Sequence, residues 1–161
     1  MVRDIENKDI GKCLEIYNYY IENTAYTLEE KCLTYGEFGN RVNDIKKDFP
    51  YLVYESEEGE VLGYAYLYLF HERSAYRKTV DLSIYVSKDH LHEGIGKKLL
   101  DDILVKSMEK GYRVIVSIVT SANPNSLSFH LKNGFVLEAT LKNVARKFNK
   151  DISTYYLLKR N

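Results

Sequence analysis

One carboxylate and two glycines stand near each other in the middle of the chain, in the segment Thr79–Leu100. Its first part, TVDLSIYV, has the period-two alternation of a strand, with Asp81 on the face opposite the apolar side chains. Gly94 and Gly96 follow, and an apolar stripe with helical spacing begins at Ile95. The free N–H groups of a helix N-terminus favour an anion, and glycines let the ligand approach the backbone. The segment therefore predicts a loop that binds an anionic group.

The glycine spacing excludes two common nucleotide-binding loops. A P-loop requires GxxxxGK followed by Ser or Thr, but Leu91 occupies the first glycine position and Lys98 follows Lys97. The dinucleotide fingerprint GxGxxG requires a third glycine where this chain has Leu99. The anion is therefore expected to bind to a different kind of loop.

The composition of the 161 residues suits one domain and argues against several classes of partner. Lys plus Arg and Asp plus Glu balance at 23 each, so no net charge attracts nucleic acid or an anionic membrane. No apolar run approaches the ~20 residues of a membrane span. The N-terminus is charged from Arg3 onward, so we expect no signal peptide. Cys13 and Cys32 form no CxxC metal site, which predicts a cytoplasmic protein without a metal.

Periodicity, caps and turn residues predict seven strands and four helices in the order β-α-α-β-β-β-α-β-α-β-β. Asn7, Thr34 and Asn123 are the expected helix caps. Hairpins combined with β-α-β crossovers imply an α/β fold with a mixed sheet and helices on both faces, in a single domain over residues 1–161. The predicted strands cover 2–5, 51–55, 61–70, 79–86, 114–119, 135–141 and 153–158, and the predicted helices 7–23, 34–49, 94–110 and 123–132.

Three further motifs follow one another in a distinctive order. They are ENTAYTLEE at 22–30, R-x-A-Y-x-x-T-V-D-x-S-I-Y-V at 73–86, and N-P-x-S-x-x-F-H-x-x-x-G-F at 123–135. With the xxGxG loop between the last two, the sequence resembles the GNAT superfamily of N-acetyltransferases over nearly its whole length. The branch that it resembles contains the phosphinothricin and methionine sulfoximine N-acetyltransferases. The resemblance implies the GNAT fold, a twisted and mostly antiparallel sheet, acetyl-CoA as cosubstrate and a homodimer.

The resemblance also implies two catalytic residues. Asp81 stands where the family carries a catalytic Glu, and an amine must lose a proton to attack a thioester, so a base is needed. The alternative for Asp81 is an ion pair with a nearby Lys or Arg. His130 stands where the branch has a His able to protonate the coenzyme thiolate, and its alternative is a structural role in the helix.

The remaining site residues are implied in the same way. Arg73 and Tyr76 are the candidates for binding an anionic group of the acceptor, and their alternative is a solvated loop. The loop departs from the usual pattern, because Leu91 stands where Gln or Arg is common and Glu93 places a carboxylate beside the coenzyme phosphates. Lys97 and Lys98 are expected to compensate, while backbone N–H groups provide most of the binding. The residues expected to bind the coenzyme are Ile84, Tyr85, Val86, His92, Glu93, Gly94, Ile95, Gly96, Lys97 and Asn123, of which Asn123 also suits a helix cap.

The sequence therefore predicts an acetyl-CoA-dependent enzyme that acetylates the primary amine of a small molecule by direct attack. An amino acid analogue such as phosphinothricin or methionine sulfoximine is the favoured acceptor. Two alternatives remain at this point: an acetyltransferase for another amine, such as a polyamine or a protein N-terminus, and a non-catalytic sensor that binds acyl-CoA.

Overall fold

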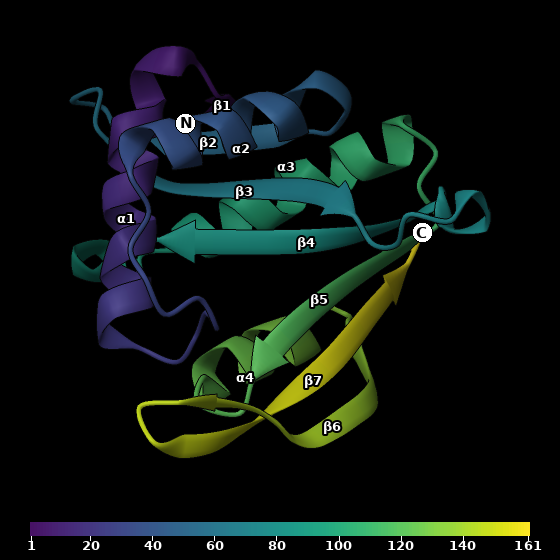
Figure 1. The fold of residues 1–161 in the computed structure, drawn as a ribbon. Helices are drawn as coiled ribbons and strands as arrows, with labels where there is room; N and C mark the ends of the chain where they lie inside the picture. The colour runs from purple at the N-terminus through teal and green to yellow at the C-terminus, as the bar shows by residue number, and fades with distance from the viewer. The chain divides into compact units, whose positions relative to one another are not determined.

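The computed structural model describes residues 1–161, with the seven strands and four α-helices that the sequence predicts (Figure 1). The strands form a mixed sheet in the order β1-β2-β3-β4-β5-β7-β6, in which β4, the strand of Asp81, is central. The strands are β1 (Val2–Asp4), β2 (Tyr51–Glu55), β3 (Val61–Leu69), β4 (Thr79–Val86), β5 (Val114–Thr120), β6 (Val136–Lys147) and β7 (Lys150–Arg160). The helices are α1 (Ile10–Asn23), α2 (Tyr35–Asp48), α3 (Ile95–Glu109) and α4 (Pro124–Lys132), with 3-10 turns at Asn7–Asp9, Ser74–Tyr76 and Lys88–His90.

The chain divides into two compact units, each made of three segments. The first unit contains Met1–Asn18, Leu33–Tyr68 and Leu82–Gly111, and the second contains Tyr19–Cys32, Leu69–Asp81 and Tyr112–Asn161. No helix has the length and apolar character needed to cross a membrane.

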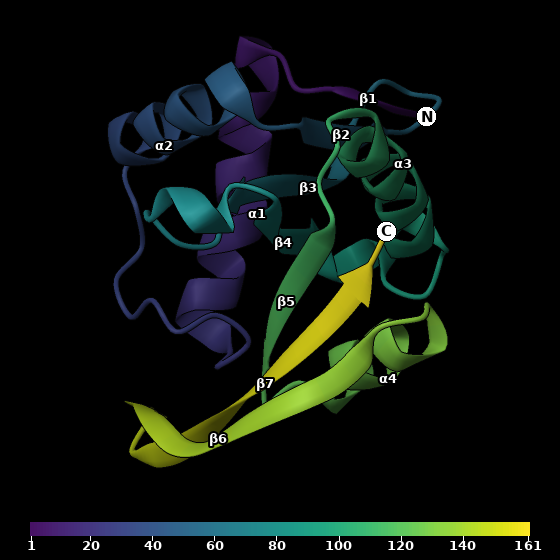
Figure 2. The same cartoon turned by 90° about the vertical axis from the view of Figure 1, so that its right-hand side faces the viewer.

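The first unit is built on the antiparallel strands β1, β2 and β3, against which α2 and α3 pack (Figure 2). Thr34 caps α2 as predicted, because its hydroxyl accepts the Glu37 N–H while the Glu37 carboxylate accepts the Thr34 N–H. Cys13 is fully buried, and burial raises the pKa of its thiol to about 12, so it is a core residue rather than a nucleophile.

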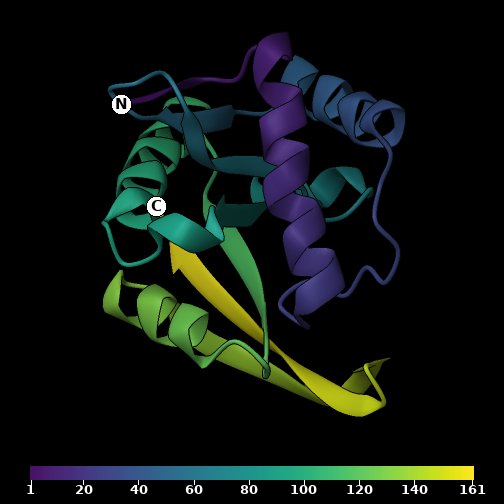
Figure 3. The ribbon, with the colours of Figure 1, turned by 90° about the vertical axis from the view of Figure 1, so that its left-hand side faces the viewer.

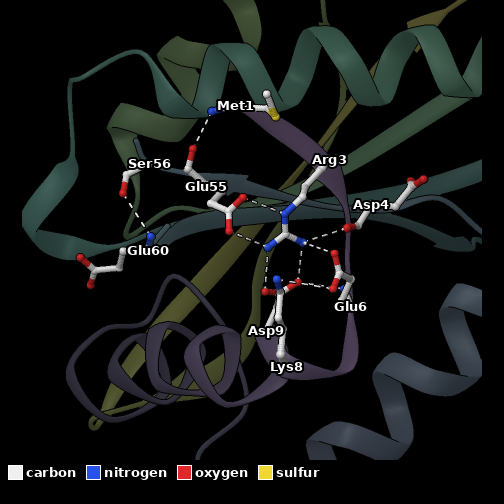
Figure 4. Close-up of polar contacts among 9 residues, drawn as sticks. All are labelled: Met1, Arg3, Asp4, Glu6, Lys8, Asp9, Glu55, Ser56 and Glu60. Atoms are coloured by element: carbon white, nitrogen blue, oxygen red, sulfur yellow. Dashed lines mark hydrogen bonds and ion pairs between the residues drawn. The ribbon is translucent and has the colours of Figure 1, made fainter. Parts of the chain in front are cut away.

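An ion cluster around Arg3 joins the start of the chain to β2 (Figure 4). The guanidinium donates to both carboxylate oxygens of Asp9 at 2.7 and 2.9 Å and to both of Glu55 at 3.1 Å. Asp9 is 3% exposed and also accepts the Glu6 N–H at 2.8 Å. Every acceptor of this cluster is therefore matched by a donor, and the cluster fixes how the chain enters α1.

The second unit contains the first residues of β4, the strands β5, β6 and β7, and α4. Thr79–Asp81 pairs with β5 in parallel, while β7 pairs antiparallel with β5 on one side and with β6 on the other. Figure 3 shows α4 beside the long β6–β7 ribbon, on which it packs. Lys147 is buried at the end of β6, where its ammonium donates to the carbonyls of Ile21, Thr27 and Glu29 at 2.6–2.9 Å.

Two local predictions are wrong. Asn7 does not cap α1: a 3-10 turn precedes the helix, Asp9 accepts the Glu6 N–H, and the Asn7 side chain instead accepts from Lys46 at 2.8 Å. The last two strands are also longer than predicted. They meet in a two-residue turn at Phe148 and Asn149, both with positive φ, where the sequence lacks the Asn-Gly or Asp-Gly that usually marks such a turn.

Candidate functional site

Asp81 is the last of the β4 residues that pair with β5, where it lies opposite Val116. Its side chain is half-buried, and burial alone raises the pKa of its carboxyl group to about 6. No Lys or Arg side chain contributes to that pKa shift, so Asp81 does not form the ion pair that was its alternative role. A carboxylate with this pKa is mostly ionised at pH 7 and yet basic enough to accept a proton.

His130 lies on α4, is 5% exposed and has hydrogen-bonding partners at both ring nitrogens. Nδ1 is 2.7 Å from the Ser126 carbonyl oxygen, and Nε2 is 2.7 Å from the Ser117 hydroxyl on β5. The rings of Phe129 and Phe135 contact the imidazole edge-on, at 5.5 and 5.0 Å between centroids. Burial lowers the pKa of His130, so the neutral imidazole is favoured.

Asn123 caps α4, as predicted, with Pro124 in the first turn. Its Oδ1 accepts the Ser126 N–H at 3.2 Å. This contact uses the oxygen of the side-chain amide and leaves the NH₂ group as a donor for a ligand.

The glycine loop leads into α3 through left-handed backbone. Gly94 is the N-cap with φ of 81°, and His92 also has positive φ, at 63°. The first intrahelical bond runs from Lys98 N–H to the Gly94 carbonyl, and a glycine cap has no side chain to cover the N–H groups of the first turn. The predicted anion-binding loop therefore has the backbone geometry that such a site needs.

The charged side chains around this loop have partners within the protein. His90 Nδ1 lies 2.9 Å from the Glu93 carboxylate, so the carboxylate that departs from the family pattern has a neighbour of its own. Lys97 pairs with Asp101 one turn along α3, and the Lys98 ammonium lies 5.4 Å from the centre of the Tyr54 ring. The two lysines expected to compensate for Glu93 thus have partners of their own, and the backbone N–H groups remain the expected main donors to the anion.

Gly63 on β3 is a residue that sequence reasoning missed. A Cβ at this position would lie 3.0 Å from the carbonyl oxygen of Tyr85, and 3.2 Å from side-chain atoms of Ile95 and Leu99. Ile84, Tyr85 and Val86, the strand residues expected to bind the coenzyme, are all half-buried. Gly63 therefore permits the close packing of β3, β4 and the start of α3 within the first unit, although an isolated Gly in a strand pattern was its only sequence signal.

Arg73 and Tyr76 lie at a 3-10 turn between β3 and β4, and both are exposed. The Arg73 guanidinium has no ion-pair partner in the chain, whereas Tyr76 packs against His71 and Phe70, with ring centroids 4.7 and 5.7 Å apart. The structure thus presents one free cation at the position expected to bind an acceptor anion. The candidate catalytic and acceptor residues belong to the second unit, and the glycine loop belongs to the first.

Several known proteins with a similar sequence or fold are acetyltransferases by name. A profile of the acetyltransferase (GNAT) domain matches residues 2–155. The phosphinothricin N-acetyltransferase of Alcaligenes faecalis is 32% identical over 95% of this chain and 78% of its own, and the L-methionine sulfoximine/L-methionine sulfone acetyltransferase of Pseudomonas aeruginosa is 30% identical over 92% and 87%. A phosphinothricin acetyltransferase from Sinorhizobium meliloti, solved with acetyl-CoA, superimposes with a TM-score of 0.96 at 32% identity, over 99% of this chain and 87% of its own.

The profile covers almost the whole chain, and the seven-stranded mixed sheet agrees with these solved structures. The chain therefore belongs to the acetyltransferase (GNAT) family and is an N-acetyltransferase.

Proposed function

We propose that this enzyme transfers an acetyl group from acetyl-CoA to the primary amine of an amino acid or amino acid analogue of the phosphinothricin or methionine sulfoximine type. The observation that carries this proposal is the half-buried carboxyl group of Asp81, which has no cationic partner and a pKa raised to about 6. The relatives that act on phosphinothricin and on methionine sulfoximine support the acceptor class.

Asp81 acts as the general base in this proposal. The acceptor amine arrives mainly as an ammonium ion, and Asp81 takes its proton directly or through one water, because Asp is one methylene shorter than the Glu usual in the family. The freed nitrogen lone pair forms a bond to the acetyl carbon while the carbon–sulfur bond breaks. The products are the acetylated amine and the coenzyme thiolate, which then takes up a proton.

The loop before α3 binds the pyrophosphate of acetyl-CoA in this proposal. The first-turn N–H groups after Gly94 supply the hydrogen bonds and the helix dipole supplies the favourable field. The backbone of Ile84–Val86 and the amide NH₂ group of Asn123 bind the rest of the coenzyme.

Arg73, with Tyr76 beside it, binds the anionic group of the acceptor in this proposal. A guanidinium pairs with a carboxylate or phosphinate through two parallel hydrogen bonds, and Arg73 has no internal partner that would have to be displaced. A cation at the acceptor site disfavours polyamines, which would be repelled. A single domain over residues 1–161, a homodimer and a cytoplasmic location stay predictions, and the expected proton donation by His130 is untested, with burial of a neutral imidazole against it.

The decisive experiment measures free-thiol release from acetyl-CoA with a panel of amino acids, phosphinothricin, methionine sulfoximine, polyamines and N-terminal peptides. We expect turnover with the amino acid analogues and acetylation of their amine by mass spectrometry. A preference for polyamines or peptides would replace the acceptor assignment. Binding of acetyl-CoA, seen as a raised melting temperature, without thiol release for any acceptor would favour the sensor instead.

A further inference from the structure

A chain of hydrogen bonds, buried at its β5 end, links β5 to the first turn of α4. The Ser117 hydroxyl contacts His130 Nε2 at 2.7 Å, and His130 Nδ1 contacts the Ser126 carbonyl oxygen at 2.7 Å. The N–H of Ser126 in turn donates to Oδ1 of Asn123 at 3.2 Å. Ser117 and His130 are 4% and 5% exposed, so solvent does not provide alternative partners for their contact, whereas Ser126 and Asn123 are half-buried.

The acceptors in the chain fix where its protons lie. A carbonyl oxygen only accepts, so His130 Nδ1 carries the hydrogen that points to Ser126. In the neutral ring Nε2 then has the lone pair, and the Ser117 hydroxyl is the donor to it. The neutral ring therefore has a single N–H, and it points at the carbonyl oxygen of Ser126. A proton given to a coenzyme thiolate would have to come from a charged imidazole, which this burial disfavours.

We propose that His130 and Ser117 are positioning residues, which lock the first turn of α4 so that the amide NH₂ group of Asn123 is held as a donor to the coenzyme. The inference rests on the proposed function, because Asn123 is assigned there to acetyl-CoA. Ser117 fixes the tautomer of His130, and His130 holds the carbonyl group of Ser126. The N–H of the same residue, which belongs to the preceding peptide group, keeps Oδ1 of Asn123 turned toward the helix. The NH₂ group is thereby left on the outer side of the cap.

The tautomer is tested on the wild-type protein without any assay of activity. Long-range ¹H–¹⁵N NMR spectra report which ring nitrogen of His130 is protonated, and we expect the neutral form with hydrogen on Nδ1 from pH 6 to pH 8. A ring with hydrogen on Nε2, or one that becomes charged near pH 6.5, would overturn the proposal. This result does not depend on finding the acceptor, so it separates the positioning role from the proposed function.

Three variants then separate positioning from proton donation. His130→Ala breaks the hydrogen-bond chain, and Ser117→Ala leaves Nε2 without its donor; for both we expect KM for acetyl-CoA to rise roughly tenfold while kcat changes less. His130→Asn keeps a side-chain N–H near the position of Nδ1 that can donate to the Ser126 carbonyl but cannot transfer a proton, so we expect it to recover most of the loss and to keep the wild-type pH profile. A fall in kcat of His130→Asn by the 10²–10⁴-fold of a lost proton donor would refute the proposal.

Discussion

Two aspartates are withdrawn from solvent in this molecule, and their surroundings are opposite. Asp9 in the first unit receives two hydrogen bonds from the Arg3 guanidinium and one from the Glu6 N–H. Burial would raise its pKa, but these hydrogen bonds outweigh burial, so the pKa of Asp9 is lowered. Asp81 in the second unit has no cation to offset burial, and its pKa is raised to about 6.

The difference separates a carboxylate that stabilises the fold from one that is proposed to accept a proton in the reaction. A buried carboxylate that is fully paired stabilises the fold and loses its basicity, because its negative charge is already satisfied. A carboxylate that is left unpaired costs folding free energy and keeps its capacity to accept a proton. Active-site residues are expected to be of the second kind. Substitution of Asp9 and of Asp81 tests the two halves of this comparison separately.

The largest expected effect is on catalysis. Asp81→Asn keeps the size of the side chain but removes the base, so kcat/KM should fall by roughly 10²–10⁴-fold at neutral pH. The apparent affinity for acetyl-CoA, measured by thermal shift, should change little. Asp81→Glu serves as the matched control, since it restores the residue usual in the family and retains a base. An Asp81→Asn enzyme as active as the wild type would remove Asp81 from the mechanism.

The next effect is on stability. Asp9→Asn removes the nearest carboxylate of the partly buried Arg3 and leaves Glu55 at 3.1 Å and Glu6 at 3.7 Å. The free energy of unfolding should fall by roughly 3 kcal/mol, the low end for a broken buried ion pair. Denaturant titration measures the loss, and kcat per folded molecule should stay at the wild-type value. Glu60→Gln removes an exposed partner of Lys12 and should cost less than about 1 kcal/mol. Equal losses for the two variants would mean that the Arg3 cluster contributes no more than a surface pair.

The third effect is a gain in stability, opposite in sign to the loss expected for Asp9→Asn. The carboxyl pKa of Asp81 is about 6 in the folded state against 3.8 in the unfolded chain, so the folded state binds more protons between these values and stability falls as pH rises. Above pH 6 the ionised carboxylate destabilises the fold, and Asp81→Asn should therefore raise the free energy of unfolding by about 1–3 kcal/mol. Denaturation at pH 8 and at pH 4 tests this, because the gain should be present at the first pH and nearly absent at the second.

The sequence alone predicts the elements whose signals are local. Thr34 with Glu37, Pro124 after Asn123, and Gly94 before the apolar stripe of α3 each determine a helix start through neighbouring residues. The ion cluster of Asp9 could not be predicted from local signals, because its partner Arg3 also binds Glu55, which is 52 residues further along the chain. Whether Asp81 meets a cation is a matter of tertiary packing, which no spacing records.

Ser117 shows a weaker signal that the sequence does contain. It is the one hydroxyl inside the apolar run Val114–Val119, and a buried polar group in such a run requires a partner. The sequence does not identify that partner as His130, because the pairing depends on α4 folding back onto the face of β5 where Ser117 points.

The smallest effect distinguishes how the amine loses its proton. If Asp81 takes it from a bound ammonium ion, kcat/KM should fall about tenfold per pH unit below pH 6, as the carboxyl group of Asp81 becomes protonated, and should level off above that pH. Asp81→Asn has no group that titrates there, so its kcat/KM should rise without a break up to the pKa of the free amine. The measurement is kcat/KM for one amino acid acceptor from pH 5 to pH 9.5 at saturating acetyl-CoA. A wild-type profile that rises through pH 6 without a break would mean that the amine enters neutral from solvent, and Asp81 would then resemble Asp9 in having no part in the chemistry.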